Sequence, residues 1–133
     1  MMTDAPLLRG YVVLVVDDDH DNLALSTVAV ESFGCGVLAA SSCDEALAIL
    51  ESGAHVDLVF SDVVMPETSG LALARIVRER RLGLPVVLAT GYPDAVDAVT
   101  ESGAISLIKP YSIPRLEAVF AEQLHVERAA RGG

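Results

Sequence analysis

A chain of 133 residues is long enough for one complete hydrophobic core and too short for two ordinary domains, so the sequence predicts a single domain. With 19 acidic against 9 basic side chains, the formal net charge of −10 argues against a sequence-independent grip on nucleic acid or anionic lipid. No apolar run reaches the length of a membrane span, and residues 1–10 lack the layout of a signal peptide, so we expect a cytoplasmic protein that binds neither membrane nor nucleic acid.

Short apolar runs alternate five times with longer amphipathic stretches along the chain. Most of these runs are continuously apolar, which is typical of strands in a parallel sheet that is covered on both faces. The predicted strands are residues 11–16, 36–40, 57–61, 85–89 and 105–108. Since parallel strands joined by helices use right-handed crossovers, the pattern predicts an α/β fold with a doubly wound sheet of five βα units.

Each predicted strand is followed by a stretch with helical spacing and recognisable end signals. The first helix follows the acidic residues 17–19 and stops at Gly34, a typical C-terminal glycine. The second begins at Ser41 or Ser42, either of which can cap it, and closes at Gly53. The remaining helices are expected within residues 70–83, 93–104 and 112–133, the last of them fraying into the tail.

Polar side chains stand at the carboxyl ends of four predicted strands, where ligands bind in open α/β sheets. They are Asp17, Asp18 and Asp19 after the first strand, Asp62 after the third, Thr90 after the fourth and Lys109 after the fifth. Carboxylates that converge on one place repel each other unless a hard divalent cation lies among them, and an incomplete set of protein oxygen ligands suits Mg²⁺. The sequence therefore predicts a magnesium site built from Asp17, Asp18 and Asp62.

The same edge has the chemistry to hold a phosphoryl group. A cation flanked by the Lys109 ammonium and the Thr90 hydroxyl provides opposite charge and a hydrogen-bond donor for a trianionic group. Asp62 is the natural acceptor, because a carboxylate can act as a nucleophile and form an aspartyl-phosphate. We therefore predict phosphorylation of Asp62, with Thr90 and Lys109 assisting.

Four stretches resemble the receiver domain of two-component response regulators, in the same order and each at a strand end. The stretches are VVDDD (residues 15–19), FSDVVMPETSG (60–70), VVLATGY (86–92) and LIKPY (107–111). The resemblance extends from Val12 to about Phe120 and implies a flavodoxin-like (βα)5 sheet with strand order 2-1-3-4-5. It places the receiver domain at residues 11–128, after an N-terminal extension (1–10) and before a flexible tail (129–133).

The resemblance also implies a set of metal ligands. Asp18 would bind Mg²⁺ directly, and Asp17 would act partly through water. The phosphoacceptor Asp62 and the backbone carbonyl of Val64 would complete the protein ligands.

Further roles come from the same resemblance. Thr90 would donate a hydrogen bond to one phosphoryl oxygen, and Lys109 would pair with another. Pro110 would follow a cis peptide bond, as in the family, and Gly70 would let the backbone turn beneath the acceptor.

Two departures from the common receiver pattern affect the expected behaviour. Ser106 occupies the position on the fifth strand where common receivers place a switching aromatic residue, so that route cannot be carried over. The stretch PVVLATGY resembles the signature of the FATGUY subclass of single-domain receivers, which also lacks this aromatic. Val64 and Tyr92 stand where the family positions an attacking water, so we hypothesise slow hydrolysis of the phosphorylated form.

The partners implied are a histidine kinase or a histidine phosphotransfer protein, with Asn22, Leu23 and Ser26 on the first helix as contact candidates, and an unknown downstream protein. We expect a phosphoacceptor signalling domain rather than an enzyme, with only intrinsic self-phosphorylation and hydrolysis, either monomeric or dimerising on phosphorylation. A stand-alone receiver is the first interpretation. A receiver module of a hybrid histidine kinase and a phosphorylation-independent scaffold are the alternatives.

Other protein classes with strand-end aspartates fit less well. A haloacid-dehalogenase-like phosphatase needs a hydroxyl residue where His20 and Asp21 follow, and the chain has no room for its cap domain. A dinucleotide-binding Rossmann domain needs glycines in the first βα turn, which holds acids here. Cys35 and Cys43 form neither a CxxC pair nor a metal-spaced set, so we expect two buried apolar side chains.

Overall fold

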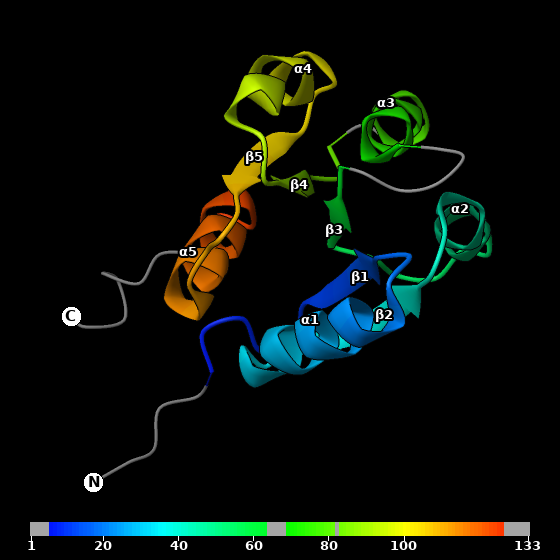
Figure 1. Cartoon of the computed structure of the whole chain (residues 1–133). Helices are drawn as coiled ribbons and strands as arrows, with labels where there is room; N and C mark the ends of the chain where they lie inside the picture. The colour runs from blue at the N-terminus through cyan, green and yellow to red at the C-terminus, as the bar shows by residue number, and fades with distance from the viewer. Residues whose placement is uncertain (1–5, 64–68, 82, 127–133) are drawn as a thin grey trace, which may run out of the picture.

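The structure is a computed structural model that describes residues 6–63, 69–81 and 83–126. Five parallel strands form one sheet in the order β2-β1-β3-β4-β5, which confirms the predicted strand order. The strands are β1 (Val12–Val16), β2 (Gly36–Ala40), β3 (Leu58–Asp62), β4 (Val86–Thr90) and β5 (Ile105–Ile108). Each helix follows its strand as predicted, so the chain has the doubly wound α/β fold (Figure 1).

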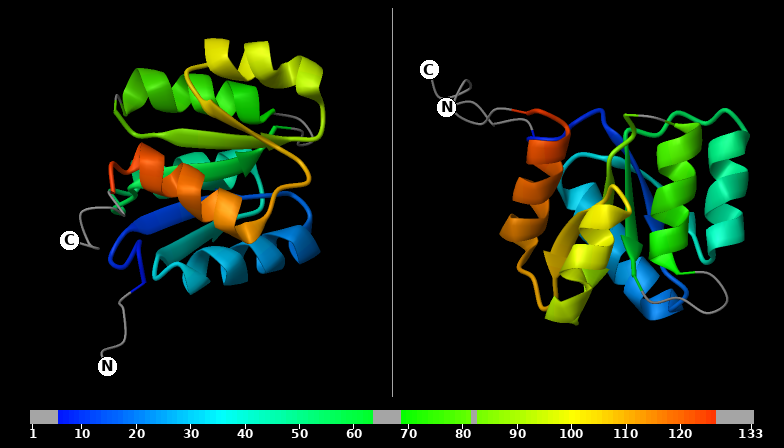
Figure 2. Two further views of the ribbon diagram at one scale, coloured as in Figure 1. Left: turned by 90° about the vertical axis from the view of Figure 1, so that its left-hand side faces the viewer. Right: turned by 90° about the horizontal axis from the view of Figure 1, so that it is seen from above.

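The helices cover both faces of the sheet. They are α1 (His20–Ser32), α2 (Cys43–Glu51), α3 (Gly70–Arg80), α4 (Val96–Glu101) and α5 (Ile113–Gln123). A 3-10 turn (Pro93–Ala95) leads directly into α4, which is shorter than the predicted helix. Helices α1 and α5 lie on one face of the sheet, and α2, α3 and α4 lie on the other (Figures 1 and 2).

Side-chain caps fix where the helices begin. Asp19 caps α1 by accepting a hydrogen bond from the backbone N–H of Asn22 at 3.0 Å. At α2, Ser42 is the cap and accepts from the backbone N–H of Glu45, while the Ser41 hydroxyl donates to the Glu45 carboxylate. The sequence left Ser41 and Ser42 as alternatives, and the structure selects Ser42. Such caps satisfy N–H groups that have no partner within the helix.

Three strands are shifted by one residue from the predicted ranges 11–16, 57–61 and 85–89. The first starts one residue later and ends as predicted, and the other two both start and end one residue later, at Leu58–Asp62 and Val86–Thr90. The parallel register explains the extension, because Asp62 pairs with Ala89 and Thr90 pairs with Ile108. Both polar residues are therefore held by the sheet itself and not by the loops that follow.

The core consists of two clusters, one on each face of the sheet. The cluster beneath α2, α3 and α4 contains Leu14, Leu73 and Leu88, each fully buried. The cluster beneath α1 and α5 contains Phe120 and Leu8. Leu8 lies in the segment predicted as an N-terminal extension, yet it is fully buried, and Leu7 packs against the same cluster, so this segment contributes to the core.

Candidate functional site

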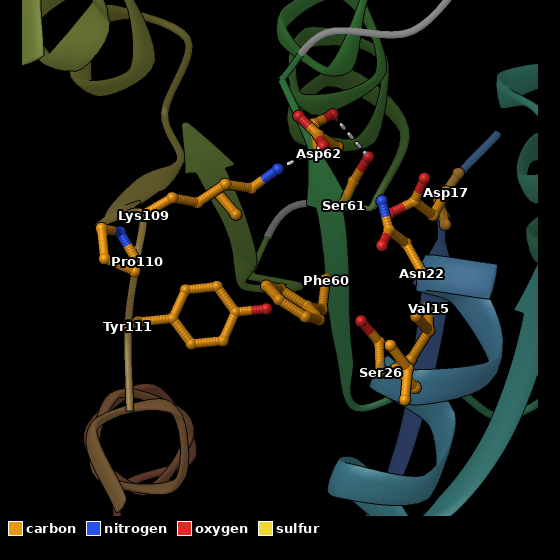
Figure 3. A pocket seen from close by; sticks show the side chains of 13 residues that line it. Val15, Asp17, Asn22, Ser26, Phe60, Ser61, Asp62, Lys109, Pro110 and Tyr111 are labelled. Atoms are coloured by element: carbon orange, nitrogen blue, oxygen red, sulfur yellow. Dashed lines mark hydrogen bonds and ion pairs between the residues drawn. The ribbon is translucent and has the colours of Figure 1, made fainter. Parts of the chain in front are cut away.

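The carboxyl end of the sheet opens into a cavity of about 810 Å³ between α1 and the β5–α5 loop. Asp17, Asp62 and Lys109 all line this cavity, although they come from three different strand ends. Figure 3 shows the Lys109 ammonium aimed at Asp62, with Asp17 on the opposite wall beside Asn22. The topology therefore brings together three of the predicted site residues.

Lys109 and Asp62 are in direct ionic contact at this edge. The Lys109 Nζ lies 2.6 Å from Asp62 Oδ2 and donates a hydrogen bond to it. Burial acts to lower the pKa of Lys109, but the hydrogen bond and the charge of Asp62, together with Asp17, outweigh it and leave this pKa raised. Lys109 is therefore a firmly charged ammonium beside the carboxylate.

The backbone around Lys109 is also fixed. Its N–H donates to the Thr90 carbonyl at 2.8 Å, which ties the end of β5 to the end of β4. The Lys109–Pro110 peptide bond is cis, which confirms the prediction made for Pro110. The chain then turns directly into Tyr111, whose ring also lines the cavity.

The surroundings of Asp17 disfavour the charged form of its carboxyl group. Its pKa is raised, first because burial removes water from it and then because the charges of Asp62 and Asp18 oppose ionisation. The backbone N–H of Asp19 donates to Asp17 Oδ1 at 2.9 Å and works in the other direction. A cation beside Asp17 and Asp62 would relieve this repulsion.

Asp18 and Thr90 do not line the cavity. The Asp18 side chain is exposed at the start of the turn into α1. Thr90 is 1% exposed, and its hydroxyl accepts a hydrogen bond from the backbone N–H of Tyr92 at 3.0 Å. Thr90 is nevertheless next to Lys109 through the backbone bond between β4 and β5.

The described part of the site provides two of the predicted magnesium ligands, Asp17 and Asp62, on one cavity. Among residues 6–63, 69–81 and 83–126, no three His, Cys, Asp or Glu side chains are grouped closely enough to hold one ion. Mg²⁺ in proteins is usually bound by one or two carboxylates and keeps several waters. Asp17 and Asp62 fit that chemistry, because both line one cavity and their negative charges repel each other there. Val64, predicted to add its carbonyl, lies outside the described residues.

Gly70 serves the site differently from the prediction. It was expected to let the backbone turn, but it is a regular residue at the start of α3 without a positive φ. A Cβ atom there would meet the Asp62 carbonyl oxygen closer than any real contact and would also press on Leu88 and Val63. Gly70 therefore allows α3 to approach the end of β3 closely.

Several residues of the site escaped the sequence interpretation. Phe60 lies two residues before Asp62 on the same face of β3 and forms part of the cavity wall. Ser26 was named only as a partner contact, and Tyr111 appeared only as the last residue of the LIKPY stretch, yet both line the same cavity. Alternation along β3 could have placed Phe60 beneath Asp62, but no local signal could have paired it with Tyr111.

Comparison with known proteins agrees with this geometry. The family model of the response regulator receiver domain matches residues 13–121. The chain belongs to this family. It is 34% identical over 122 residues to the sensor kinase CckA of Brucella abortus (strain 2308), a match that covers 88% of this chain and 13% of CckA. The chain thus spans a small part of that relative.

Solved structures are similar over most of the chain. A response regulator receiver domain protein from Clostridium thermocellum superposes with a TM-score of 0.81 at 28% identity, covering 86% of this chain and 94% of that one. The response regulator TrrA from Thermotoga maritima, solved in complex with Mg²⁺ and BeF, superposes with a TM-score of 0.78 at 25% identity, covering 86% and 99%. Receivers of this family are signalling domains.

No helix in the described ranges is long and apolar enough to cross a bilayer.

Proposed function

We propose that this receiver domain accepts a phosphoryl group on Asp62 in a two-component phosphorelay. The observation that carries the proposal is the 2.6 Å contact between Lys109 Nζ and Asp62 Oδ2 at the rim of a cavity that Asp17 also lines. A carboxylate held at a strand end beside a fixed ammonium is placed to attack phosphorus and to have the transferred charge neutralised. Membership of the receiver family supports the same assignment.

In the proposed transfer, an Asp62 carboxylate oxygen forms a bond to phosphorus while the bond from phosphorus to the donor atom breaks. The donor leaves with that electron pair. Lys109, which donates to the Asp62 carboxylate before the transfer, pairs with one phosphoryl oxygen after it, and the Thr90 hydroxyl donates to another. The donor is the phosphohistidine of a histidine kinase or of a histidine phosphotransfer protein.

A bound Mg²⁺ would neutralise charge on the phosphoryl oxygens during the transfer. We assign its protein ligands to Asp17, Asp18, Asp62 and the Val64 carbonyl. The raised pKa of Asp17 supports a cation at this position, because burial and the neighbouring carboxylates disfavour its bare charge. The complex of TrrA with Mg²⁺ and BeF is further support.

The phosphorylated form is proposed to be long-lived for a receiver. Tyr92 stands two residues beyond Thr90, and its side chain is 65% exposed, so it is free to lie over the site without offering the carboxylate or amide that orients an attacking water. We expect Tyr92→Asn to shorten the phosphoryl lifetime, measured as loss of added mass with time. Equal decay in wild type, Tyr92→Asn and Tyr92→Ala would contradict this role.

The setting of the domain has two candidates. A stand-alone cytoplasmic receiver, monomeric or dimerising on phosphorylation, would signal to an unknown downstream protein and have no catalysis beyond self-phosphorylation and hydrolysis. A module of a hybrid histidine kinase is the second candidate, favoured by the 34% identity to the sensor kinase CckA. Rapid passage of the phosphoryl group from Asp62 to a phosphotransfer protein would favour the second.

The decisive experiment is incubation of the purified chain with Mg²⁺ and acetyl phosphate, followed by intact-mass measurement. We expect one added phosphoryl group that requires Mg²⁺ and is absent in Asp62→Asn, with the fold of the variant verified by circular dichroism. A phosphorylated Asp62→Asn would overturn the acceptor assignment. Absence of both added mass and Mg²⁺ binding in the wild type would favour the scaffold alternative, whereas absence of added mass with Mg²⁺ binding retained would indicate a strict need for a cognate kinase.

A further inference from the structure

A separate hollow lies at the opposite edge of the sheet from Asp62. It has a volume of about 380 Å³ and opens at the amino end of β4, between the α3–β4 loop and the end of α5. Helices α3 and α5 lie on opposite faces of the sheet (Figure 2), so the hollow collects side chains from both faces. Three of these side chains, Arg78, Gln123 and His125, carry hydrogen-bond donors.

Arg78 is held at this hollow by two contacts, although its side chain is exposed. Its Nη1 donates to the backbone carbonyl of Glu101 at 3.4 Å. Its stem lies over Gly103, because a Cβ atom at that glycine would be only 2.9 Å from Arg78 Cδ. Among the residues that the structure describes, Arg80 pairs with Glu51, whereas no carboxylate forms an ion pair with Arg78. The other N–H groups of this positioned guanidinium are therefore available to an external anion.

His125 is distinguished by its backbone. Helices α1, α2, α3 and α4 are each followed shortly by a glycine with a positive φ, namely Gly34, Gly53, Gly83 and Gly103. After α5 this conformation falls on His125, with a φ of 59°, and no other non-glycine residue in the described part of the chain has a positive φ. A side chain is less favourable than glycine in this conformation, and residues held in it gather at functional sites. His125 lines the hollow, so its imidazole has a place to act there.

The hollow has an apolar floor beside these donors. Leu84, Pro85 and Val86, at and just before the start of β4, line it. A bare inorganic anion would meet the donors but leave this floor in contact with water. A volume of about 380 Å³ lies in the range of small-molecule pockets. The chemistry therefore suits an organic anion whose oxygens face Arg78 and whose apolar body covers the floor.

We propose that this hollow binds a small organic anion, a carboxylate or a phosphate monoester with an apolar body. The Arg78 guanidinium pairs with the anionic oxygens, and Gln123 and His125 donate further hydrogen bonds to them. The apolar body lies on Leu84 and Val86. The bound anion joins α3 to the end of α5, so it stabilises the folded domain increasingly as its concentration rises.

The first test is a titration of the purified full chain in Mg²⁺-free buffer, followed by two-dimensional amide NMR. The probes are benzoate and phenyl phosphate, one for each kind of anionic group. The amide signals of Gly83 and Gly103, which both line the hollow, should shift saturably with a Kd in the millimolar range. Gly36, on the edge strand β2, is the internal control and should not shift.

Two further compounds test the two halves of the ligand. Inorganic phosphate lacks the apolar body, and benzyl alcohol lacks the charge. Each should bind at least about tenfold more weakly than the probes, because it loses either the burial of the ring or the hydrogen bonds to a charged group.

Arg78→Met tests the guanidinium. Methionine keeps an unbranched stem that can lie over Gly103 but removes the charge, so the Kd for both probes should rise at least about tenfold. Arg75→Met is the matched control, because Arg75 is exposed on the same helix, does not line the hollow and carries the same charge. Its Kd should equal that of the wild type. An equal rise in both variants would mean a general effect of net charge and would overturn the site.

His125→Gly separates a role in binding from a role in ending α5. Glycine accepts the positive φ, so the midpoint of thermal unfolding should stay equal or rise. The Kd should nevertheless rise by about fivefold, as for a lost neutral hydrogen bond. A folded His125→Gly that binds both probes as the wild type does would show that the imidazole only ends the helix, and would overturn the proposal as stated.

The titrations decide the ligand class. Absence of a saturable shift at Gly83 and Gly103 with both probes overturns the proposal, and so does equal affinity for inorganic phosphate or benzyl alcohol. Binding of one probe alone supports the site and identifies its anionic group. The proposed function of Asp62 is unaffected by any of these outcomes, because phosphorylation is measured separately by intact mass.

Discussion

The two faces of the sheet are built from different side chains. The cluster beneath α2, α3 and α4 is wholly aliphatic apart from Cys43, whereas all three phenylalanines, Phe33, Phe60 and Phe120, lie beneath α1 and α5. The groove between α2 and α3 has a volume of about 190 Å³, and the cavity on the aromatic side has about 810 Å³. The larger space thus lies on the side with the larger and stiffer side chains.

This difference is informative about the site. Branched aliphatic chains on one face interdigitate and hold the strands of the sheet in register, so the strand ends stay in place. Rings on the other face meet edge-to-face, and a cavity of about 810 Å³ lies beside them between α1 and the β5–α5 loop. One face therefore fixes the position of Asp62, and the other leaves room for change beside it.

The largest expected effect is on the aromatic face, at Phe120. This ring is fully buried and contacts both Phe33 and Phe60, so Phe120→Ala removes two ring pairs and leaves a hole. We expect a loss of about 3–5 kcal/mol in the free energy of unfolding, measured by urea denaturation. Leu88→Ala on the aliphatic face is the matched control, at about 2–5 kcal/mol. A cost near zero for Phe120→Ala would mean that the aromatic face repacks freely.

Gly70→Ala is expected to disturb the aliphatic face and the position of Asp62 together. The added Cβ would press on the Asp62 carbonyl and on Leu88, so α3 must move away from β3. We expect a loss of about 1–3 kcal/mol, as for other overpacked sites, and slower uptake of phosphoryl mass from acetyl phosphate. Gly91→Ala is the control for stability, because a Cβ at Gly91 meets nothing within 4 Å. Equal free energies of unfolding of the two variants would show that α3 can move away from β3 without loss of stability.

The sequence was sufficient to predict the arrangement of strands and the edge where the site lies. The continuous apolar runs that end in Asp17, Asp62 and Lys109 can be recognised from the local sequence alone. The parallel topology that such runs predict then brings their ends together. The fold and the meeting of these three residues could therefore be predicted before any coordinates. The one-residue extension to Asp62 and Thr90 could not, because strand ends are set by pairing between neighbours.

What the sequence could not show depends on packing between distant segments. Two examples are the close approach of Gly70 to Asp62 and the contact of Tyr111 with Phe60. In each pair, the spacing of apolar residues along the sequence does not predict that the two residues meet. The burial of Leu8 beneath α1 is of the same kind. Cavities are likewise a property of what several segments fail to fill, so they have no signature in a single stretch.

A pair of alanine substitutions sharpens the comparison of the two faces. Ala46 is fully buried in the aliphatic cluster, and Ala89 is 2% exposed but borders the cavity. We expect Ala46→Val to cost about 1–3 kcal/mol through overpacking and Ala89→Val to cost less than about 1 kcal/mol, since its extra methyl groups have free space. Urea denaturation of both variants measures the difference. The reverse order would show that the gap beside Ala89 is closed in solution.

The smallest expected effect comes from the two cysteines, one on each face. Both thiols are free and buried, as predicted, with Cys43 in the aliphatic cluster and Cys35 in the aromatic one. Burial raises the pKa of Cys35 to about 11, and the charges of Asp57 and Glu117 add to the rise. Burial raises the pKa of Cys43 as well.

The sign of the pH effect follows from these shifts. A thiol whose pKa is raised by folding favours the folded state fully below its ordinary pKa of 9.0, and this contribution is lost as the pH rises through about 11. Urea denaturation of wild type and Cys35→Ala should therefore show a stability difference that shrinks between pH 9.0 and about 11. Iodoacetamide labelling, resolved by peptide mass, should leave Cys35 unmodified at pH 8 in the folded protein, because only the thiolate reacts. If Cys35 is labelled rapidly while Cys43 stays protected, the aromatic face opens by local unfolding independently of the aliphatic face. The two faces would then differ in their dynamics as well as in their packing.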